Sequence, residues 1–287
     1  MEHIITGYTT LYGLLGYPIK HSKSPRMQNL AFAKTGVDGV YLTFDVTKDT
    51  LEDAVKAMRL LNVGGFQVTM PNKEAVLPLL DELSEEARLV GSLNVVKNTN
   101  GVLKGYNTDG MGFIMNLDQK GIAYKGKKMV QIGVGGAGRA VAIQTALSGA
   151  AELIIYDIDA EKACNVAEVI NQNIPGCHAS GHLMNEEDVI KEVQDADLLV
   201  DCTPLGMPPL DDKSSLSSFE KVPKNVVVVD ICHTPPLTKF LAMAQANGNT
   251  TVNGVGMMYC QGAKAFNIWT GKEFPMEYVK EKMGLPE

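Results

Sequence analysis

Short apolar runs alternate with amphipathic segments along the first hundred residues of the chain. Three runs rich in β-branched and aromatic residues have the length of strands, at 11–17, 40–46 and 64–70. Three segments repeat apolar residues at helical spacing, at 24–36, 50–61 and 73–83. Alternation of this kind is typical of a parallel sheet covered by helices. The pattern therefore predicts an N-terminal α/β domain.

A turn signal interrupts this alternation near the middle of the chain. Two strand-like runs flank Asn100-Gly101, a dipeptide that favours a two-residue hairpin loop. A second alternating series begins after it and ends in two helical segments without a further clear strand. We therefore expect an N-terminal α/β substrate domain, formed by residues 1–108 with returning helices in 254–287, and a Rossmann-type dinucleotide-binding domain over 109–253.

Composition and charge narrow the class of partner. The 287 residues are 45% hydrophobic, enough to bury a core in each of two domains, and the formal net charge is -7 without a basic block. We therefore expect a small-molecule ligand rather than nucleic acid or a membrane. The five cysteines form no C-x-x-C pair, which is typical of free thiols in a reducing compartment, so we expect a cytoplasmic protein. We expect a monomer or a homodimer.

A glycine-rich turn opens the second alternating series. A G-x-G-x-x-G pattern stands directly between a strand-like run and a helical segment. Glycines allow a tight turn and a close backbone approach, and the helix N-terminus offers N–H groups to a pyrophosphate. We expect dinucleotide binding, with a merely tight strand-to-helix connection as the alternative. The candidate contacts here are Gly133, Gly135, Gly136, Ala137, Gly138 and Arg139.

The end of the next strand-like run bears on which dinucleotide binds. Asp157 stands where a carboxylate accepts hydrogen bonds from an adenosine ribose. Together with Asp159 it places two negative charges where the 2′-phosphate of NADP needs a cation. We predict NAD as the preferred cofactor, while Arg139 leaves NADP open as the alternative.

Polar residues follow the strand-like runs of the N-terminal half. The carboxyl ends of parallel strands are where open α/β sheets bind ligands. Lys73 and Asp109 add an amine and a carboxylate, which suits proton transfer at a hydroxyl group, although a solvated surface lysine is the alternative for Lys73. The neutral candidates are Ser22, Ser24, Thr69, Asn94 and Asn107. We expect a site for a polyhydroxylated substrate and no metal.

Five segments, in this order and over nearly the whole length, resemble the shikimate dehydrogenase family. They read GYPIKHSKSPRMQN, VTMPNKE, GYNTDGMGF, GVGGAGRA and GMMYCQGAKAFNIWTG. The MPNK form and the ending WTGKEFPMEYVKEKMG look most similar to the branch of shikimate/quinate dehydrogenases that accept both acids. The resemblance implies reversible oxidation of quinate or shikimate to the 3-dehydro acid.

The resemblance also implies roles for individual residues. Lys73 and Asp109 would exchange the proton of the reacting hydroxyl, while the nicotinamide exchanges hydride. Ser22 and Ser24 would hold the substrate carboxylate. The ring hydroxyls would be held by Thr69, Asn94 and Asp109, with Gln261 on the returning helix. The edge of the cofactor site would include Thr203, Gly206, Met207, Gly254 and Met257.

Three segments depart from the family pattern. Gln67 stands where asparagine is common, and its extra methylene moves the amide toward or away from a ring hydroxyl. His233 replaces a tyrosine by a group that titrates near neutral pH, with an ordinary loop histidine as the alternative. Asp201 and Cys202 change the segment before Gly206-Met207, and we expect Cys202 to be a buried small residue. Gln67 and His233 are thus additional candidates for substrate contacts.

Two other functions remain compatible with these residues. One is a related dehydrogenase acting on a substituted cyclitol acid such as aminoshikimate, which Gln67 and His233 leave open. The other is a non-catalytic sensor of NAD or a cyclitol acid on the same scaffold, which the presence of both Lys73 and Asp109 disfavours.

Overall fold

The structure, a computed structural model, describes residues 4–284 and separates into two compact units. One unit contains the chain up to Thr108 and the returning segment from Gln261, and the other runs from Asp109 to Cys260. The seam falls inside helix α9 (Gly254–Thr270), so residues 254–260 lie with the second unit rather than with the returning segment. The division into one domain of residues 1–108 with 254–287 and another of residues 109–253 remains a prediction.

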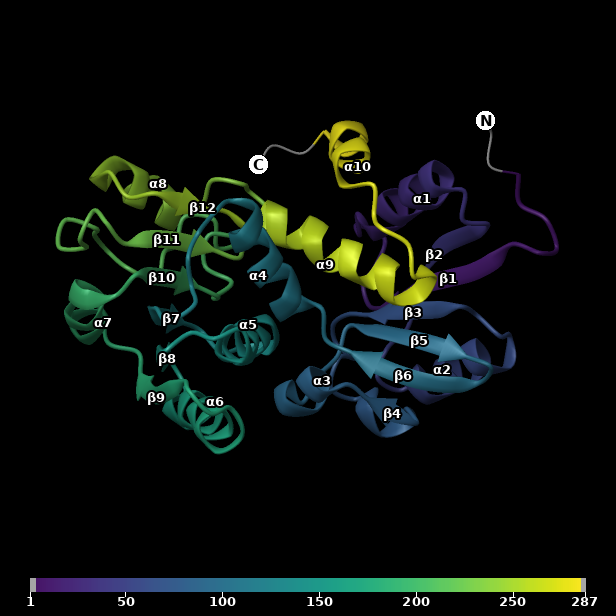
Figure 1. Ribbon diagram of the computed structural model, residues 1–287, viewed down its shortest axis with the longest axis horizontal. Helices are drawn as coiled ribbons and strands as arrows, with labels where there is room; N and C mark the ends of the chain where they lie inside the picture. Colours follow the sequence, from purple (N-terminus) through teal and green to yellow (C-terminus); the bar gives the residue numbers. More distant parts are fainter. Residues whose placement is uncertain (1–3, 285–287) are drawn as a thin grey trace. The chain divides into compact units, whose positions relative to one another are not determined.

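A mixed six-stranded sheet forms the centre of the first unit, in the order β2-β1-β3-β5-β6-β4 (Figure 1). Its strands are β1 (Thr10–Gly16), β2 (Gly39–Asp45), β3 (Gly65–Val68), β4 (Glu82–Leu83), β5 (Val95–Thr99) and β6 (Val102–Tyr106). Strands β1, β2 and β3 run parallel, as predicted, whereas β5 is antiparallel to both β3 and β6. The predicted hairpin is confirmed, because Asn100 (φ 53°) and Gly101 (φ 90°) connect β5 to β6.

Helices cover both faces of this sheet, α1, α9 and α10 on one side and α2 and α3 on the other (Figure 1). Aromatic rings fill the first face, where Tyr12 of β1 lies 5.0 Å from Phe32 and 5.4 Å from Trp269, measured between ring centroids. Apolar side chains from β1 and β3, such as Leu15 and Phe66, fill the second. The helices are α1 (Ser24–Thr35), α2 (Leu51–Leu60), α3 (Glu85–Val90) and α10 (Met276–Met283).

The helix expected over residues 73–83 is wrong. A single 3-10 turn (Leu77–Leu79) is followed by strand β4, which pairs with β6. Pro78 in this turn has no N–H to donate, which disfavours a longer helix. Pairing with the hairpin therefore outweighs the apolar spacing, which resembled that of a helix.

A parallel six-stranded sheet forms the centre of the second unit, in the order β12-β11-β10-β7-β8-β9. Its strands are β7 (Lys128–Ile132), β8 (Glu152–Asp157), β9 (His178–Leu183), β10 (Leu198–Asp201), β11 (Val227–Asp230) and β12 (Thr251–Val252). The order reverses between β7 and β10, as in dinucleotide-binding folds. The two predicted α/β units are therefore confirmed.

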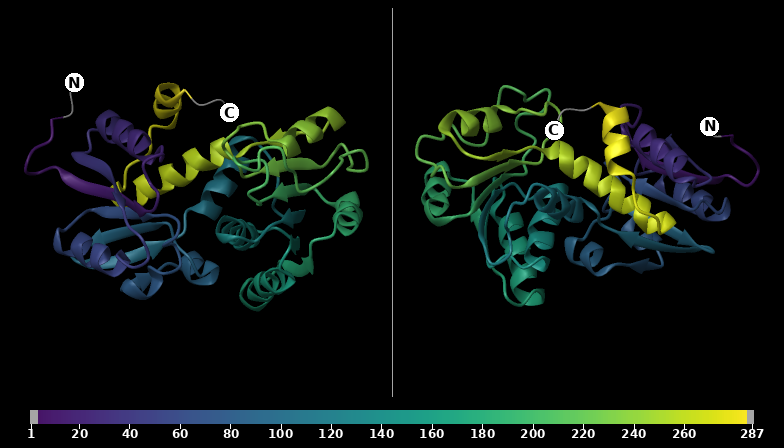
Figure 2. Two further views of the ribbon diagram at one scale, coloured as in Figure 1. Left: turned by 180° about the vertical axis from the view of Figure 1, so that it is seen from behind. Right: turned by 45° about the horizontal axis from the view of Figure 1, so that its top comes forward.

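Helices also cover the second sheet, as the turned views in Figure 2 show. Side chains of α7 and α8 pack on one face, against Val130 and Ile132 of β7. Helices α5 and α6 contact β8, and α4 packs on α5. The helices are α4 (Asp109–Gln119), α5 (Gly136–Leu147), α6 (Ala160–Asn173), α7 (Glu186–Glu192) and α8 (Lys239–Asn247), with a 3-10 turn at Val193–Asp195.

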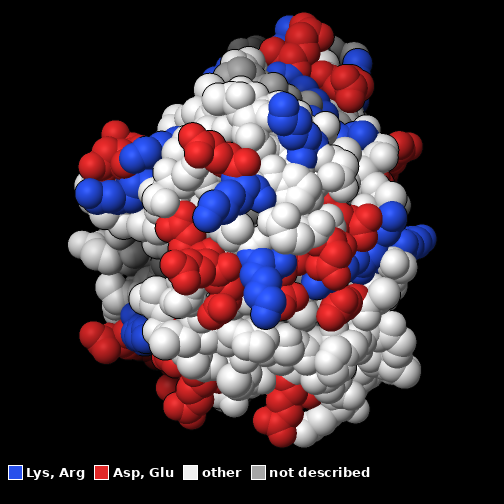
Figure 3. All heavy atoms as spheres, turned by 90° about the vertical axis from the view of Figure 1, so that its left-hand side faces the viewer, with Lys and Arg blue, Asp and Glu red and all other residues white. Residues whose placement is uncertain are grey.

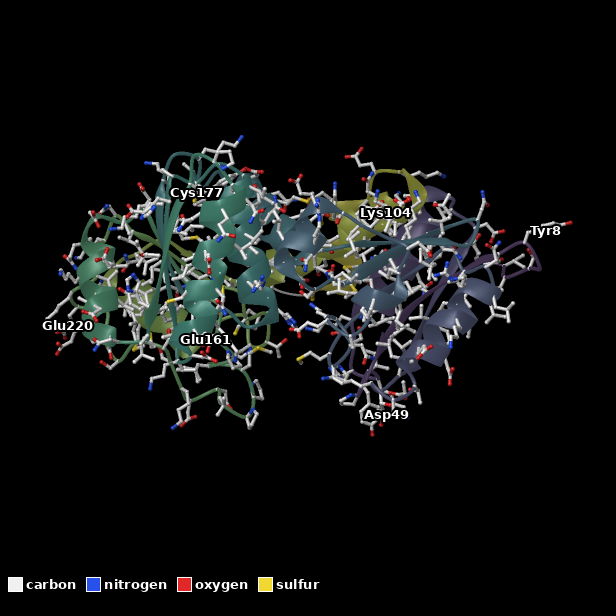
Figure 4. All side chains as sticks on the ribbon, turned by 90° about the horizontal axis from the view of Figure 1, so that it is seen from below. Tyr8, Asp49, Lys104, Glu161, Cys177 and Glu220 are labelled. Carbon is white, nitrogen blue, oxygen red and sulfur yellow. The ribbon has the colours of Figure 1, made fainter. Side chains whose placement is uncertain are left out.

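Charged side chains of both signs are interspersed on the surface. On the face shown in Figure 3, lysines and arginines stand beside aspartates and glutamates and form no single field of one sign. Asp49, Glu161 and Glu220 extend away from the ribbon in Figure 4. Over residues 4–284, no helix is long and apolar enough to cross a membrane, and no three His, Cys, Asp or Glu side chains are grouped to hold a metal ion.

Candidate active site

The substrate residues predicted in the first unit lie at one edge of its sheet. Strands β1 and β3 are parallel, so the residues that follow them, such as Ser22 and Thr69, lie at the same end. Because β5 runs antiparallel to β3, Asn94 just before β5 stands at that end too. Strand β6 reverses again and brings Asn107 back to it. The topology thus gathers four polar segments at one edge.

Two serines stand where helix α1 begins. The N–H of Ser24 donates to Oγ of Ser22 at 3.2 Å, and the N–H of Ser22 donates to the carbonyl of Ile19 at 3.0 Å. Both serine side chains are half-buried. Hydroxyls and backbone N–H groups at a helix start are suited to hold a carboxylate.

The loop after β3 positions Lys73. Thr69 donates its N–H to the carbonyl of Leu15 at 2.9 Å and accepts from the N–H of Asn72 at 2.9 Å. The fully buried Asn72 anchors the loop, since its Nδ2 donates to the carbonyl of Val46 at 2.7 Å. Lys73 is half-buried, and its carbonyl accepts from the N–H of Leu93 at 3.0 Å. Backbone hydrogen bonds of this loop therefore fix the position of Lys73.

A buried amide network fixes the neighbouring loops. Oδ1 of Asn94 accepts from the N–H of Thr108 at 2.7 Å, and its Nδ2 lies 3.0 Å from Oγ1 of Thr108. Nδ2 of Asn107 donates to the carbonyl of Ser92 at 3.0 Å. These bonds define the path of the chain into Asp109, the first residue of α4, which is 8% exposed.

Gln67 and Gln261 meet in the first unit. Nε2 of Gln67 donates to Oε1 of Gln261 at 3.1 Å, although 194 residues separate them. Oε1 of Gln67 accepts from the hydroxyl of Tyr41 at 2.7 Å. The two predicted substrate residues are therefore joined to each other and to a buried tyrosine that we did not predict.

The glycine-rich turn of the second unit has the geometry that its pattern predicts. Gly133 has φ +92°, and a Cβ on Gly138 would lie 2.3 Å from the carbonyl oxygen of Gly133, so both positions require glycine. A Cβ on Gly135 or Gly136 would meet nothing within 4 Å. This open space lies over the N-terminus of α5, where the residues fit the pyrophosphate of a dinucleotide. Ala137 and Arg139 follow in the first turn of that helix.

The side chains of Gln131 and Asp157 brace this turn through hydrogen bonds to its backbone. Gln131, fully buried in β7, donates from Nε2 to the carbonyls of Gly133 at 2.9 Å and Gly138 at 2.8 Å. The carboxylate of Asp157 accepts from the N–H of Val134 at 2.7 Å and from the N–H of Asp159 at 3.0 Å. Each carboxylate oxygen can accept further bonds, so Asp157 can also receive a ribose hydroxyl.

The segment after β10 packs on the glycine-rich turn. A Cβ on Gly133 would lie 3.0 Å from the backbone carbon of Cys202, which is buried as predicted. Asp201 accepts from the N–H of Thr203 at 2.8 Å and from Oγ of Ser215 at 2.5 Å. Gly206 has φ +90° and precedes Met207 in the same loop.

Two buried carboxylates stand side by side at the ends of β10 and β11. Asp201 pairs in register with Asp230, and both are fully buried. Burial, and secondarily repulsion by Asp230, raises the pKa of Asp201 from 3.8 to about 6. Burial also raises the pKa of Asp230, which accepts from the N–H of Cys232 at 2.8 Å and from the hydroxyl of Thr238 at 2.6 Å.

The remaining predicted residues follow β11. Nδ1 of His233 lies 2.9 Å from Oγ1 of Thr234, and the ring is half-buried. Gly254 donates its N–H to the carbonyl of Cys232 at 2.9 Å, and a Cβ there would overlap the carbonyl of Ile231. Gly254 thus permits close backbone packing, and Met257 is buried one turn later in α9. Contact of these residues with cofactor or substrate stays a prediction.

Sequence reasoning missed Tyr41, Gln131 and Asp230. Gln131 carries a usable signal, because a glutamine two residues before Gly133 interrupts the apolar run of the strand. Tyr41 carries none, since tyrosine is common in strands and its partner lies 26 residues away.

Parts of the chain match known protein families, and its full length matches known proteins. Residues 14–96 match the family described as shikimate dehydrogenase substrate binding domain, and residues 254–283 match shikimate 5'-dehydrogenase C-terminal domain. The shikimate dehydrogenase (NADP(+)) of Alkaliphilus metalliredigens is 50% identical over 280 residues, which cover 98% of each chain. The chain belongs to the shikimate dehydrogenase family.

Two further members of the shikimate dehydrogenase family are similar to this chain over nearly its whole length. The quinate/shikimate dehydrogenase of an Escherichia coli strain is 38% identical over 284 residues, covering 98% of this chain and 99% of that protein. The crystal structure of the Listeria monocytogenes shikimate 5-dehydrogenase in complex with shikimate and NAD superposes with a TM-score of 0.95. It is 41% identical and covers 99% of both chains.

Proposed function

We propose that this protein is an NAD-preferring shikimate/quinate dehydrogenase in which Lys73 and Asp109 handle the proton of the reacting hydroxyl. NAD(P)-dependent shikimate/quinate dehydrogenase activity follows from the family and its relatives. The observation that carries the proposal further is the single sheet edge at which Ser22, Thr69 and Asn94 gather around the loop of Lys73.

The roles of the chain's own residues follow from their chemistry. Ser22 and Ser24 bind the substrate carboxylate through their hydroxyl groups at the start of α1. The amine of Lys73 accepts the proton of the secondary hydroxyl during oxidation and returns it during reduction, with Asp109 as the carboxylate of the proposed pair. NAD, when bound on the glycine-rich turn, supplies the acceptor for the hydride released from the same carbon.

The preference for NAD rests on charge near the ribose. Asp157 presents a carboxylate at the end of β8, and Asp159 adds a second two residues later. Nζ of Lys162 lies 3.2 Å from Oδ2 of Asp159 in an exposed ion pair. A 2′-phosphate would meet repulsion from the carboxylates of Asp157 and Asp159. Relatives described with NADP and with NAD both occur.

The catalytic part is tested by Lys73→Ala. We expect kcat for shikimate and quinate oxidation to fall at least about 100-fold, the usual size of a general acid/base contribution. Lys97→Ala is the matched control, since Lys97 is also half-buried and lies in the same sheet on β5. Unchanged turnover by Lys73→Ala would remove the lysine from the mechanism, and a parent that binds shikimate without turnover would support a sensor instead.

The cofactor part is tested by the ratio of kcat/KM for NAD and NADP. We expect the parent to favour NAD, and Asp157→Asn to lower the ratio of kcat/KM for NAD to that for NADP by about 10-fold, because one charged acceptor of the ribose is lost. A parent that favours NADP would contradict the argument from Asp157.

A further inference from the structure

Two carboxylates are buried side by side in the second unit, at the carboxyl ends of β10 and β11. Asp201 and Asp230 are in register in this parallel pair, and both residues are 0% exposed. Residues in register on neighbouring parallel strands point to the same face of the sheet, with Cα atoms about 5 Å apart. The two acidic groups are therefore close neighbours in the interior.

Neutral groups hold this pair in place. Within residues 4–284 no cation pairs with either carboxylate, and the donors are the N–H groups of Thr203 and Cys232 and the hydroxyls of Ser215 and Thr238. Burial raises the pKa of the neighbouring thiols of Cys202 and Cys232, so both stay uncharged at neutral pH. When the pair is ionised, no cation beside it neutralises its charge.

The pair lies on one half of the predicted dinucleotide site. The strand order reverses between β7 and β10, and a dinucleotide spans such a reversal. We assign the adenosine ribose to Asp157 at the end of β8, so the nicotinamide half falls to the ends of β10 and β11. Cys202, directly after Asp201, packs on the glycine-rich turn, since a Cβ on Gly138 would lie 3.0 Å from its Cβ. The charge of the pair is thus placed to act on the nicotinamide half.

The two redox forms of the cofactor differ in charge at this half. The nicotinamide ring carries a positive charge in NAD and none in NADH, so a fixed negative charge nearby attracts only the oxidised ring. We propose that Asp201 and Asp230 are a specificity-determining pair that strengthens binding of the oxidised cofactor relative to the reduced cofactor. The pair acts through its charge and is not a ligand site of its own. The inference rests on the dinucleotide binding of the proposed function, and neither on the role of Lys73 nor on a preference for NAD.

The effect should depend on pH because the pair binds a proton close to neutrality. Burial, and secondarily repulsion by Asp230, raises the pKa of Asp201 to about 6, so this carboxyl is ionised at pH 8 and mostly protonated at pH 5. The advantage of the oxidised cofactor is therefore larger at pH 8. By linkage, NAD bound to the protein lowers the pKa of the pair, and its binding near pH 6 releases protons.

The test is the ratio of Kd for NADH to Kd for NAD, measured by calorimetry with parent and Asp201→Asn. We expect the variant to lower this ratio about 5-fold at pH 8, the lower end of usual coupling between sites, and to change it less at pH 5. Asp211→Asn is the control, because this exposed carboxylate lies in the loop after β10 and should leave the ratio unchanged. Asp230→Asn is a second variant, for which we expect a fall in the same direction.

Proton release gives a second readout. In two buffers of different ionisation enthalpy at pH 6, NAD binding to the parent should release about 0.3 proton more than NAD binding to Asp201→Asn. His233, three residues after Asp230, also titrates near neutral pH, so the difference between parent and variant assigns the effect to Asp201.

A parental ratio in Asp201→Asn at pH 8, or an equal change at both pH values, would overturn the inference. NADPH and NADP give the same comparison if the parent prefers them, so a wrong prediction of cofactor preference leaves this test intact. No turnover is measured, so a loss of the proposed activity and a failure of the inference are recognised separately.

Discussion

The paired carboxylates of β10 and β11 allow a prediction of stability against pH. The pKa of Asp201 rises from 3.8 to about 6 because the group is buried and stands beside Asp230. One pH unit between the folded and unfolded pKa corresponds to about 1.4 kcal/mol. Ionising Asp201 in the folded protein therefore costs about 3 kcal/mol of unfolding free energy at pH 8.

The sign follows from proton binding in the two states. Below pH 3.8 the carboxyl is protonated in both states, and its contribution to stability is fully present. As pH rises toward about 6, the unfolded chain releases the proton first, so stability is progressively lost. Above that pH the loss is complete and constant. At pH 4.5 the cost of Asp201 is about 1 kcal/mol.

Asp201→Asn removes this cost while keeping the shape. The amide oxygen can still accept from the N–H of Thr203, and the hydroxyl of Ser215 can turn to accept from the new NH₂ group. We expect the variant to be more stable than the parent by up to about 3 kcal/mol at pH 8 and by about 1 kcal/mol at pH 4.5. Urea unfolding at both pH values measures the difference.

The control for this prediction is Asp211→Asn, in the loop that follows β10. Asp211 is exposed, so its replacement should change stability little and equally at both pH values. A variant Asp201→Asn that is less stable than the parent at pH 8 would refute the reasoning. It would mean that the hydrogen bonds to Thr203 and Ser215 stabilise the ionised form by more than burial and Asp230 disfavour it.

Two further substitutions test a hydrogen-bonded turn in the second unit and a close packing contact in the first. Gln131→Leu should raise KM for NAD about 10-fold and leave KM for shikimate near the parental value, because it removes two hydrogen bonds to the glycine-rich turn. Steady-state kinetics measure both constants, and a KM for NAD equal to that of the parent would contradict this. Gly65→Ala should lower unfolding free energy by about 2–4 kcal/mol in thermal or urea unfolding, because the new Cβ would lie 2.4 Å from Nε1 of Trp269, which donates to Val96 at 3.0 Å. Gly7→Ala meets nothing within 4 Å and should be neutral, so equal losses in both variants would refute the steric argument.

Local chemistry made several elements predictable from sequence. Asn100-Gly101 specifies a hairpin because both residues adopt positive φ, and the register Thr99 with Val102 follows from the two-residue loop. Gly133 and Gly138 are predictable for the same kind of reason, since a Cβ is incompatible with the turn. In these cases the decisive interactions lie within a few residues of one another.

Other features depend on contacts that no short window contains. Residues 82–83 become a strand because β6 offers an edge to pair with, although the apolar spacing of 73–83 predicts a helix. The contact of Gln67 with Gln261 requires that α9 return to the first sheet after 194 residues. The segments around Lys73 predict the substrate class, whereas the hydrogen bond from the buried phenol of Tyr41 to Gln67 joins two strands that are 26 residues apart in sequence.

The glutamine in β7 has a consequence for how related sequences can change. Gln131 spans the carbonyls of Gly133 and Gly138 and fills space beneath them, so the three positions form one unit of variation. An apolar replacement at 131 leaves two oxygens to find other donors, and an altered turn leaves a buried amide without its acceptors. Homologues that change residue 131 should therefore also change residues 133 and 138, and an alignment should show correlated substitutions at these three positions.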